Sequence, residues 1–182
     1  MRNKWIYDKV NALVKKYGTR DPETLINDLN VKLRYISETS TLLGMYRVIL
    51  RNRYIFIPSN VGALKKTVLA HELGHDQLHR EFSAQGVGFH ESRIFNPTNT
   101  YETEANIFAA HLLISDQDVL SLIEEAGSDV ELASELGVEI NLLDLKISEL
   151  VKMKMLNLDN AKIAKTESTF LKRYRPSDGN DG

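Results

Sequence analysis

The sequence predicts an α+β fold in which a small, mostly antiparallel sheet of three strands packs on a long helix, followed by a helical C-terminal part. Three observations support this prediction. Segments rich in β-branched and aromatic residues lie between positions 31 and 58, a helical pattern spans 61–80, and helical periodicity returns between 101 and 156. Strands grouped before helices are typical of α+β proteins.

Two short helices precede the predicted sheet. Apolar residues recur at helical spacing from Ile6 to Tyr17, and Gly18 follows as a stop signal. Asp21 stands before Pro22 as an N-cap, so a second helix begins there. We interpret both helices as scaffold.

The three predicted strands read VKLRYI, GMYRVIL and RYIFIP, over residues 31–36, 44–50 and 53–58. Arg51-Asn52 is the expected tight connection between the second strand and the third. Pro58 ends the third strand, and Ser59 or Asn60 caps the helix that follows. An edge strand beside the site described below would pair with an extended peptide through main-chain hydrogen bonds. A sheet that only covers the helix is the alternative.

The helix over 61–80 carries the pentapeptide His71-Glu72-Leu73-Gly74-His75, an HExxH motif. Positions i and i+4 share one helix face, so both imidazoles can bind one metal ion while Glu72 projects over its bound water. Both histidines also interrupt the apolar stripe of this helix, where a polar group needs a partner. Zinc-dependent hydrolysis is therefore the leading hypothesis. Two core histidines hydrogen-bonded to carbonyl groups are the alternative.

A third metal ligand must come from another segment, because a catalytic zinc has three protein ligands and an open position. The helix predicted over 101–113 carries Glu102 about 60° from the centre of its apolar arc, and Glu104 about 100° from it on the other flank. Glu102 is the predicted ligand and Glu104 the alternative. Asn106, one turn further on, is expected to hydrogen-bond a ligand and fix its orientation. His111 points to the polar flank and is expected at the surface.

Four more side chains are candidates for orienting a ligand or stabilising the transition state. Tyr101 precedes Glu102, whereas His90 and Arg93 fall in a loop over 81–100 that contains one short strand at most. His79 lies on the buried stripe one turn beyond His75, and we expect it not to bind the metal. Solvated loop residues are the alternative for His90 and Arg93, and a satisfied core histidine is the alternative for His79.

Composition limits the classes of partner. With 182 residues, of which 42% are hydrophobic, the chain fits one compact domain. A net charge of −2 predicts neither nucleic-acid binding nor attraction to an anionic membrane. The chain has no cysteine, so a metal must be held by imidazole and carboxylate groups. No signal sequence or membrane-length apolar run is present, and we expect a soluble, cytoplasmic protein.

The C-terminal third is predicted to be helical. A helix capped by Ser115 or Asp116 places Leu120 inward and ends at Gly127. Two helices then flank a turn at 136–138, in an arrangement similar to a helix-turn-helix. Its second helix is acidic, which argues against DNA binding, and we interpret it as packing or partner-docking structure. Partly exposed residues of that helix are expected to dock a partner: Leu142, Leu143 and Ile147.

These motifs resemble a known family: HELGHDQLH followed by ETEANIFAAHLL is similar to the ImmA/IrrE metallo-endopeptidases. The matching positions are His71, Glu72, Gly74, His75, Leu78, His79, Glu102, Ala105, Asn106, Phe108, Ala109, Leu112 and Leu113. The family often has a proline after the LL pair, where this chain reads Ile114-Ser115-Asp116. The resemblance implies a gluzincin-like, zinc-dependent core and a helix-turn-helix transcriptional repressor as substrate. Members of the phage or mobile-element type are the closer comparison, because no sensory domain is seen after the core.

The expected organisation is a metallopeptidase-like core over 1–115, a structural helical extension over 116–156 and a partly flexible tail over 157–182. The predicted function is an anti-repressor peptidase, in which Glu72 takes a proton from zinc-bound water and returns it to the leaving amine. A non-catalytic regulator that sequesters the repressor is the alternative. A DNA-binding regulator is a weaker third hypothesis.

Overall fold

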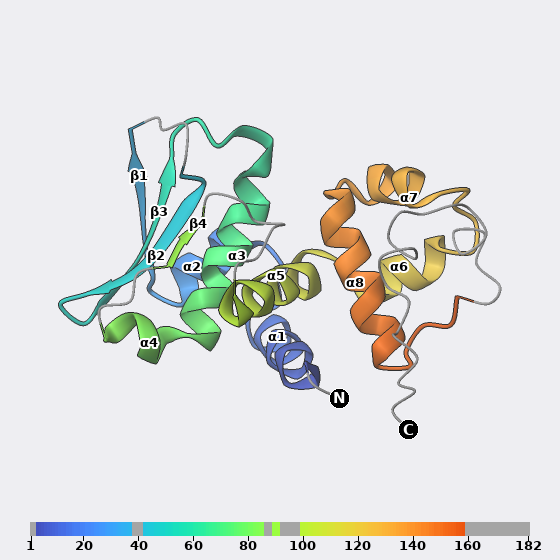
Figure 1. The fold of residues 1–182 in the computed structure, drawn as a ribbon, viewed down its shortest axis with the longest axis horizontal. Coiled ribbons are helices and arrows are strands. Elements are labelled where there is room, and N and C mark those ends of the chain that lie inside the picture. Colours follow the sequence, from blue (N-terminus) through green and yellow to red (C-terminus); the bar gives the residue numbers. More distant parts are fainter. Residues whose placement is uncertain (1–2, 38–41, 86–88, 92–98, 159–182) are drawn as a thin grey trace, which may run out of the picture. The chain divides into compact units, whose positions relative to one another are not determined.

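A computed structural model describes residues 3–37, 42–85, 89–91 and 99–158 (Figure 1). The chain divides into two compact units, Met1–Leu113 and Ile114–Gly182. The first unit contains the sheet and the helices that carry the motifs, and the second is helical. No helix in the described ranges is long and apolar enough to cross a membrane.

The first unit begins with the two predicted helices, α1 (Lys4–Tyr17) and α2 (Pro22–Asp28). Gly18 ends α1 in the left-handed region at φ 69°, where a residue without Cβ is least strained. The Asp21 carboxylate caps α2 by accepting a 2.8 Å hydrogen bond from the Thr24 N–H. Both boundaries therefore follow from local sequence signals.

The sheet has four strands in the order β1-β3-β2-β4. Their bounds are Lys32–Ile36 for β1, Gly44–Ile49 for β2, Asn52–Pro58 for β3 and Phe89–Glu91 for β4. β1 runs parallel to β3, whereas the β2–β3 and β2–β4 pairs are antiparallel. The predicted α+β class is confirmed, and β4 extends the sheet by one short strand from the segment interpreted mainly as a loop.

The β2–β3 connection lies one residue earlier than predicted. Leu50 and Arg51 form it with φ values of 48° and 64°, while Asn52 already pairs with Ile49. Two successive positive φ values are typical of the type I′ turn, whose twist matches that of the flanking strands. The prediction of Arg51-Asn52 was wrong because strand pairing selected a turn that Leu50 does not favour by itself.

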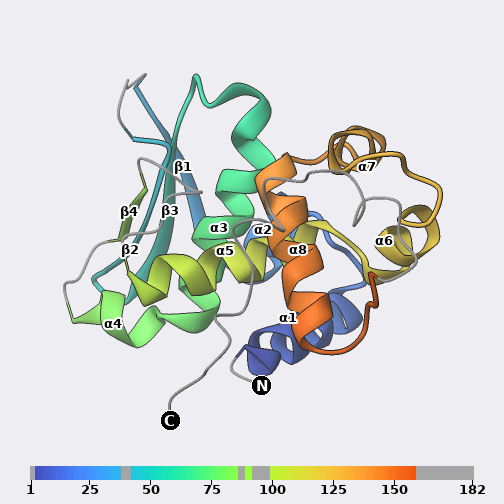
Figure 2. The same ribbon diagram turned by 45° about the vertical axis from the view of Figure 1, so that its right-hand side comes forward.

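The segment predicted as one helix over 61–80 is divided. A 3-10 turn (Gly62–Leu64) precedes α3 (Lys65–Leu78), and α4 (Arg80–Ala84) follows it. The N-cap of α3 is Leu64 without a side-chain cap, so the prediction of a cap at Ser59 or Asn60 was wrong. Helix α3 contacts β2 and β3 as well as α5 (Thr100–Leu113), as Figures 1 and 2 show.

Helix α1 packs on α5 and covers His111. The His111 side chain is buried and its ring lies edge-on to Tyr7, with 5.1 Å between centroids. The expected surface position was wrong, because the wheel of α5 alone does not reveal that α1 covers this flank.

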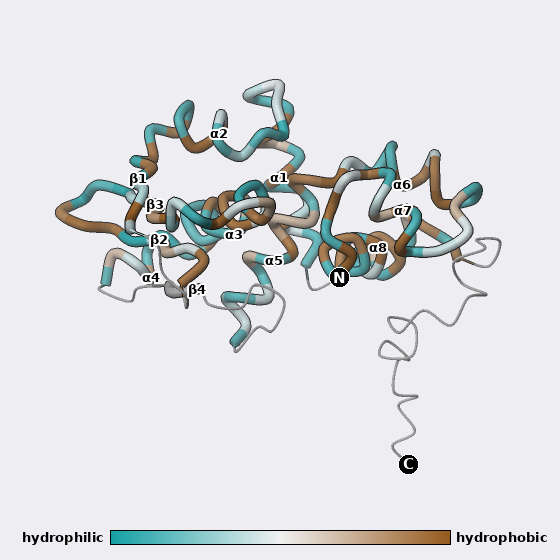
Figure 3. The backbone as a smooth tube through the Cα atoms, turned by 90° about the horizontal axis from the view of Figure 1, so that it is seen from above, coloured by the Kyte–Doolittle hydropathy of each residue, from teal (hydrophilic) through white to brown (hydrophobic). Residues whose placement is uncertain are grey.

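The second unit contains α6 (Asp116–Leu122), α7 (Asp129–Leu136) and α8 (Ile140–Lys152). Ser115 caps α6, while Leu120 is 44% exposed instead of facing inward. Hydrophobic segments recur along α8 in Figure 3. The residues expected to be partly exposed there are buried, which contradicts their use for docking: Leu142, Leu143 and Ile147. Most of the predicted tail, 159–182, lies outside the described residues.

Candidate metal centre

Helices α3 and α5 approach closely because small residues face each other. A Cβ atom at Gly74 would lie 3.1 Å from the Cα of Ala105 and 3.3 Å from the Cβ of Phe108. A larger residue at position 74 would push the helices apart, since protein interiors have little spare volume. The close approach brings Glu102, in the first turn of α5, to the histidines of α3.

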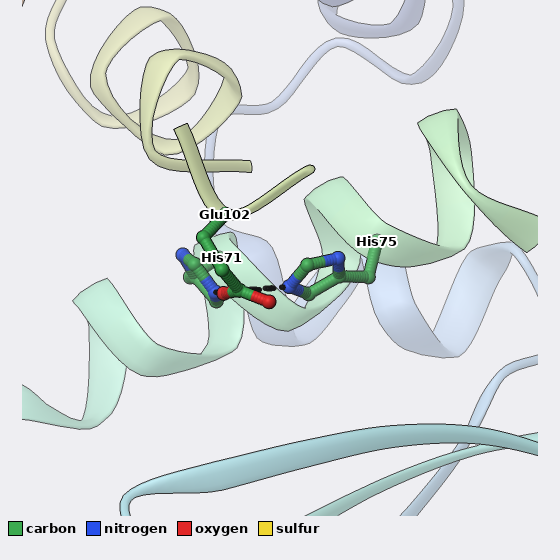
Figure 4. A group of neighbouring side chains, drawn as sticks. All are labelled: His71, His75 and Glu102. Atoms are coloured by element: carbon green, nitrogen blue, oxygen red, sulfur yellow. Dashed lines mark hydrogen bonds and ion pairs between the residues drawn. The ribbon is translucent and has the colours of Figure 1, made fainter. Parts of the chain in front are cut away.

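His71, His75 and Glu102 converge on one point (Figure 4). The His71 Nε2 atom lies 3.0 Å from His75 Nε2 and 3.1 Å from Glu102 Oε2, and His75 Nε2 lies 3.4 Å from the same oxygen. All three side chains are buried. The structure therefore brings together the two motif histidines and the predicted carboxylate, in a group that could hold a metal ion.

Each histidine has a polar neighbour at its other ring nitrogen. The His71 Nδ1 atom lies 2.8 Å from Asn106 Oδ1, as the sequence predicted for a residue one turn after Glu102. The His75 Nδ1 atom lies 3.0 Å from Nδ1 of His79, the residue that ends α3. Ring orientation at the cluster is thus fixed by neighbours that do not belong to it.

Burial favours the neutral imidazoles that metal binding requires. Desolvation lowers the pKa of His75 to about 3, although the adjacent Glu102 carboxylate opposes the shift. Desolvation also lowers the pKa of His79, against the opposing effect of Glu104. A neutral imidazole has one N–H and one lone pair, so a ring can donate at one nitrogen and bind a cation at the other. Imidazole and carboxylate groups in this arrangement fit a divalent metal ion.

The Glu72 side chain lies against the start of β2. A Cβ atom at Gly44 would lie 2.5 Å from Glu72 Oε1 and 2.7 Å from Val68 Cγ1. Only glycine therefore lets the buried Glu72 carboxylate lie against the strand. Sequence reasoning missed Gly44, because a glycine at the start of a strand is more often a turn residue.

Sequence reasoning also missed the contacts of Asp76, which follows His75. Its buried carboxylate accepts hydrogen bonds from Tyr46 Oη at 2.8 Å and from Arg53 at 2.9 Å. Arg80 lies 3.3 Å from the same carboxylate. Burial raises the pKa of Tyr46, so its hydroxyl stays protonated as a donor. The signal for this network was a charged residue on a helix that is otherwise buried.

The remaining candidate residues differ in their distance from the cluster and in how much of them the structure describes. Glu104, the alternative ligand, lies outside the cluster and pairs with His79, with 3.0 Å between Oε2 and Nε2. The Tyr101 ring is edge-on to that of His79, 5.0 Å between centroids. His90 belongs to β4, where the structure describes only the backbone, and Arg93 lies outside the described residues.

Hollows open on the described part of the first unit. One of about 610 Å³ is bordered by residues that include Lys9, His79, Tyr101 and Glu104. The other, about 570 Å³, lies between α2 and β1 and contains no candidate site residue in its lining. The first hollow is thus bordered by His79 and Glu104, the neighbours of His75, whereas the lining of neither hollow includes His71, His75 or Glu102.

Comparison with known proteins agrees with the motif positions. Residues 26–148 match the model of the IrrE N-terminal-like domain, a peptidase family designated M78. A protein of Bacillus phage phi105, named uncharacterized immunity region protein 2, is 35% identical over 143 residues. That similarity covers 78% of this chain and 89% of the phage protein. The family match includes the segments that supply His71, Glu72, His75 and Glu102.

Proposed function

Because the chain belongs to the IrrE N-terminal-like peptidase family, we propose that it is a zinc-dependent endopeptidase that cleaves a helix-turn-helix transcriptional repressor. Cleavage would release the genes of a phage or mobile element from repression. The observation that carries this proposal is that Glu102 of α5 meets His71 and His75 of α3, the helix that also presents Glu72.

Zinc is the proposed metal because of the donor set and its spacing. Tetrahedral zinc with ligand distances of 2.0–2.2 Å places neighbouring ligand atoms roughly 3.3–3.6 Å apart. The three donor atoms are separated by 3.0, 3.1 and 3.4 Å, so small side-chain movements would bring them to that geometry. Two imidazoles and one carboxylate also leave a fourth position for water or substrate.

Glu72 is the proposed general base. Bound zinc would supply a Lewis acid that lowers the pKa of water to about 7 and polarises a peptide carbonyl. The Glu72 carboxylate would take a proton from the attacking water and return it to the leaving amine. Its position against Gly44 restricts the conformations of the side chain and so supports this role.

The sheet edge supports a peptide substrate. β4 pairs with β2 through Gly44 and Glu91, so the edge strand passes beside the strand that borders Glu72. In the part of the chain that the structure describes, β4 pairs with β2 alone. An extended peptide could add to that edge of β4 through main-chain hydrogen bonds. Further along β2, the Val48 N–H donates a 3.1 Å hydrogen bond to the Ser83 hydroxyl, so this N–H is not available to pair with a peptide.

A repressor as substrate is supported by the relative and by charge. The phage phi105 protein is named for an immunity region, which suggests control of phage genes. The net charge of −2 gives no electrostatic reason to expect direct binding of this chain to DNA. A protein that binds DNA is a more plausible target than DNA itself.

Coexpression with a repressor encoded by the same element tests the proposal. We expect the wild-type chain to produce one defined repressor fragment under inducing conditions, and Glu72→Gln to produce none while it still binds zinc. Glu124→Gln, at an exposed carboxylate of the second unit, is the matched control and should cleave normally. An intact repressor with the wild-type chain would contradict the proposal. Derepression that survives Glu72→Gln would favour sequestration instead.

A further inference from the structure

A continuous series of polar contacts leads from the proposed metal ligand His75 through the His79 ring to the Glu104 carboxylate. His75 Nδ1 and His79 Nδ1 are 3.0 Å apart, and His79 Nε2 lies 3.0 Å from Glu104 Oε2. We infer that His79 and Glu104 are positioning residues that hold His75 in the tautomer whose Nε2 lone pair faces the metal. This inference rests on the proposed function and names two residues on which its metal site depends.

The positions of the ring protons of His79 and His75 follow from the Glu104 carboxylate, the last group in this series. An ionised carboxylate only accepts hydrogen bonds, so Glu104 requires the proton of His79 on Nε2. His79 Nδ1 then has a lone pair and accepts from His75 Nδ1–H. This leaves the lone pair of His75 on Nε2, the atom that lies 3.4 Å from Glu102 Oε2 and 3.0 Å from His71 Nε2. One carboxylate therefore selects the tautomers of two rings.

The two proposed ligand imidazoles are oriented by different groups. At Nδ1 of His71, Asn106 Oδ1 accepts directly at 2.8 Å, whereas Nδ1 of His75 is linked to the Glu104 carboxylate through His79. His79 is the C-cap residue of α3, with φ −125°, and its ring centroid lies 5.2 Å from that of His75. The Tyr101 ring then packs edge-on against His79.

A purely structural His–Glu pair would stabilise the first unit without selecting a tautomer. The geometry favours selection, because the His79 side chain is only 3% exposed and both of its ring nitrogens have polar neighbours. A buried imidazole with a defined partner at each nitrogen has one tautomer that satisfies both. Partners of this kind typically change metal affinity by about 10–100-fold when they are removed.

Paired substitutions in the full-length, zinc-loaded chain test this inference. We expect Glu104→Met and His79→Leu, which remove an acceptor, to weaken zinc affinity about 10–100-fold in competition with a chelator. Glu104→Gln and His79→Asn keep an acceptor oxygen and should restore most of that affinity. Nitrogen NMR of His75 should show Nδ1 protonated in the wild type and in both conservative variants.

Asp76→Asn is the matched control, because it changes a buried carboxylate beside His75 that bonds Tyr46 and Arg53 instead of a ligand ring. It should lower thermal stability but leave zinc affinity and the His75 tautomer unchanged. If Glu104→Met and His79→Leu both bind zinc with wild-type affinity, the inference is overturned, while the proposed function stands. Failure of the wild-type chain to bind zinc would overturn the proposed function as well.

Discussion

The two compact units bury different kinds of side chain. In Met1–Leu113, buried polar side chains of α3 and α5 turn toward one another, and they include three histidines and Glu102. In Ile114–Gly182, the described residues bury mainly aliphatic side chains such as Leu132, Leu142 and Leu150. Buried charges there form ordinary ion pairs, Lys146 with Asp116 at 2.5 Å and Glu149 with Lys152 at 2.6 Å.

This difference distinguishes a binding site from packing. Burying polar groups costs free energy unless each finds a partner, and an ion pair of opposite charges satisfies itself. Two imidazoles and a carboxylate with their donor atoms within 4.8 Å of one another can be satisfied together by a shared cation. We therefore expect substitutions in the cluster of His71, His75 and Glu102 to alter chemistry, and substitutions of the buried ion pairs in the second unit to alter stability only.

The largest contrast is expected between two buried glutamates. Glu102→Ala removes a proposed ligand, so zinc affinity should fall by more than the about 10–100-fold expected for the loss of a ligand's hydrogen-bond partner. Glu149→Ala removes a buried carboxylate that pairs with Lys152 in the second unit and should leave zinc affinity unchanged. Chelator competition on both variants measures the difference. Equal affinities would show that the cluster is not the metal site.

A smaller contrast is expected between two glycines that each face a glutamate. At Gly44 a Cβ atom would lie 2.5 Å from Oε1 of the buried Glu72, whereas at Gly127 it would lie 2.9 Å from Oε2 of the exposed Glu131. Gly44→Ala must displace the proposed base, and we expect an about 100-fold lower kcat. In Gly127→Ala the Glu131 side chain can move into solvent, and kcat should be unchanged.

Single-turnover cleavage and bound zinc should be measured together for both glycine variants. Gly44→Ala should retain its zinc, because the metal cluster lies on the α5 side of α3. Normal cleavage by Gly44→Ala would mean that Glu72 tolerates displacement. Loss of zinc from that variant would show instead that position 44 supports the whole cluster.

Local sequence signals were sufficient to predict helix boundaries where a capping residue stands at the start of the helix. Asp21 and Ser115 cap their helices as predicted, and the family resemblance is confirmed by the match over residues 26–148. Glu102 was aimed correctly because helical phase relative to an apolar arc is a property of one segment. Its role as a ligand stays a prediction.

Features that depend on partners distant in sequence were missed. The approach of Gly44 to Glu72 and the pairing of His79 with Glu104 depend on how separate elements meet. The same reason explains the burial of His111 under α1 and of Leu142 in the second unit. A single-element pattern gives the direction of a side chain but not what covers it.

The smallest expected effect is the change of stability with pH. Acid is expected to stabilise the second unit and to destabilise the metal-free first unit. Burial, with a smaller contribution from Asp129, raises the pKa of Asp144 to about 6. Between about pH 4 and pH 6 the native second unit therefore binds a proton that the unfolded chain lacks, so its stability falls as pH rises from about 4 to 6 and levels off above 6. In the metal-free first unit the pKa of His75 is lowered to about 3, so acid below about pH 6.5 destabilises it.

Asp144→Asn removes the acid response of the second unit alone. Because Asp144 is only partly buried, we expect the variant to exceed the wild type by about 1–2 kcal/mol at pH 7 and to match it near pH 4. Hydrogen exchange of the α7 and α8 amides, corrected for intrinsic rates, reports this unit separately. Glu124→Gln, at an exposed position, should keep the wild-type slope. Identical slopes for Asp144→Asn and the wild type would mean that Asp144 stays solvated in the native protein, and the contrast between the units would then rest on the metal cluster alone.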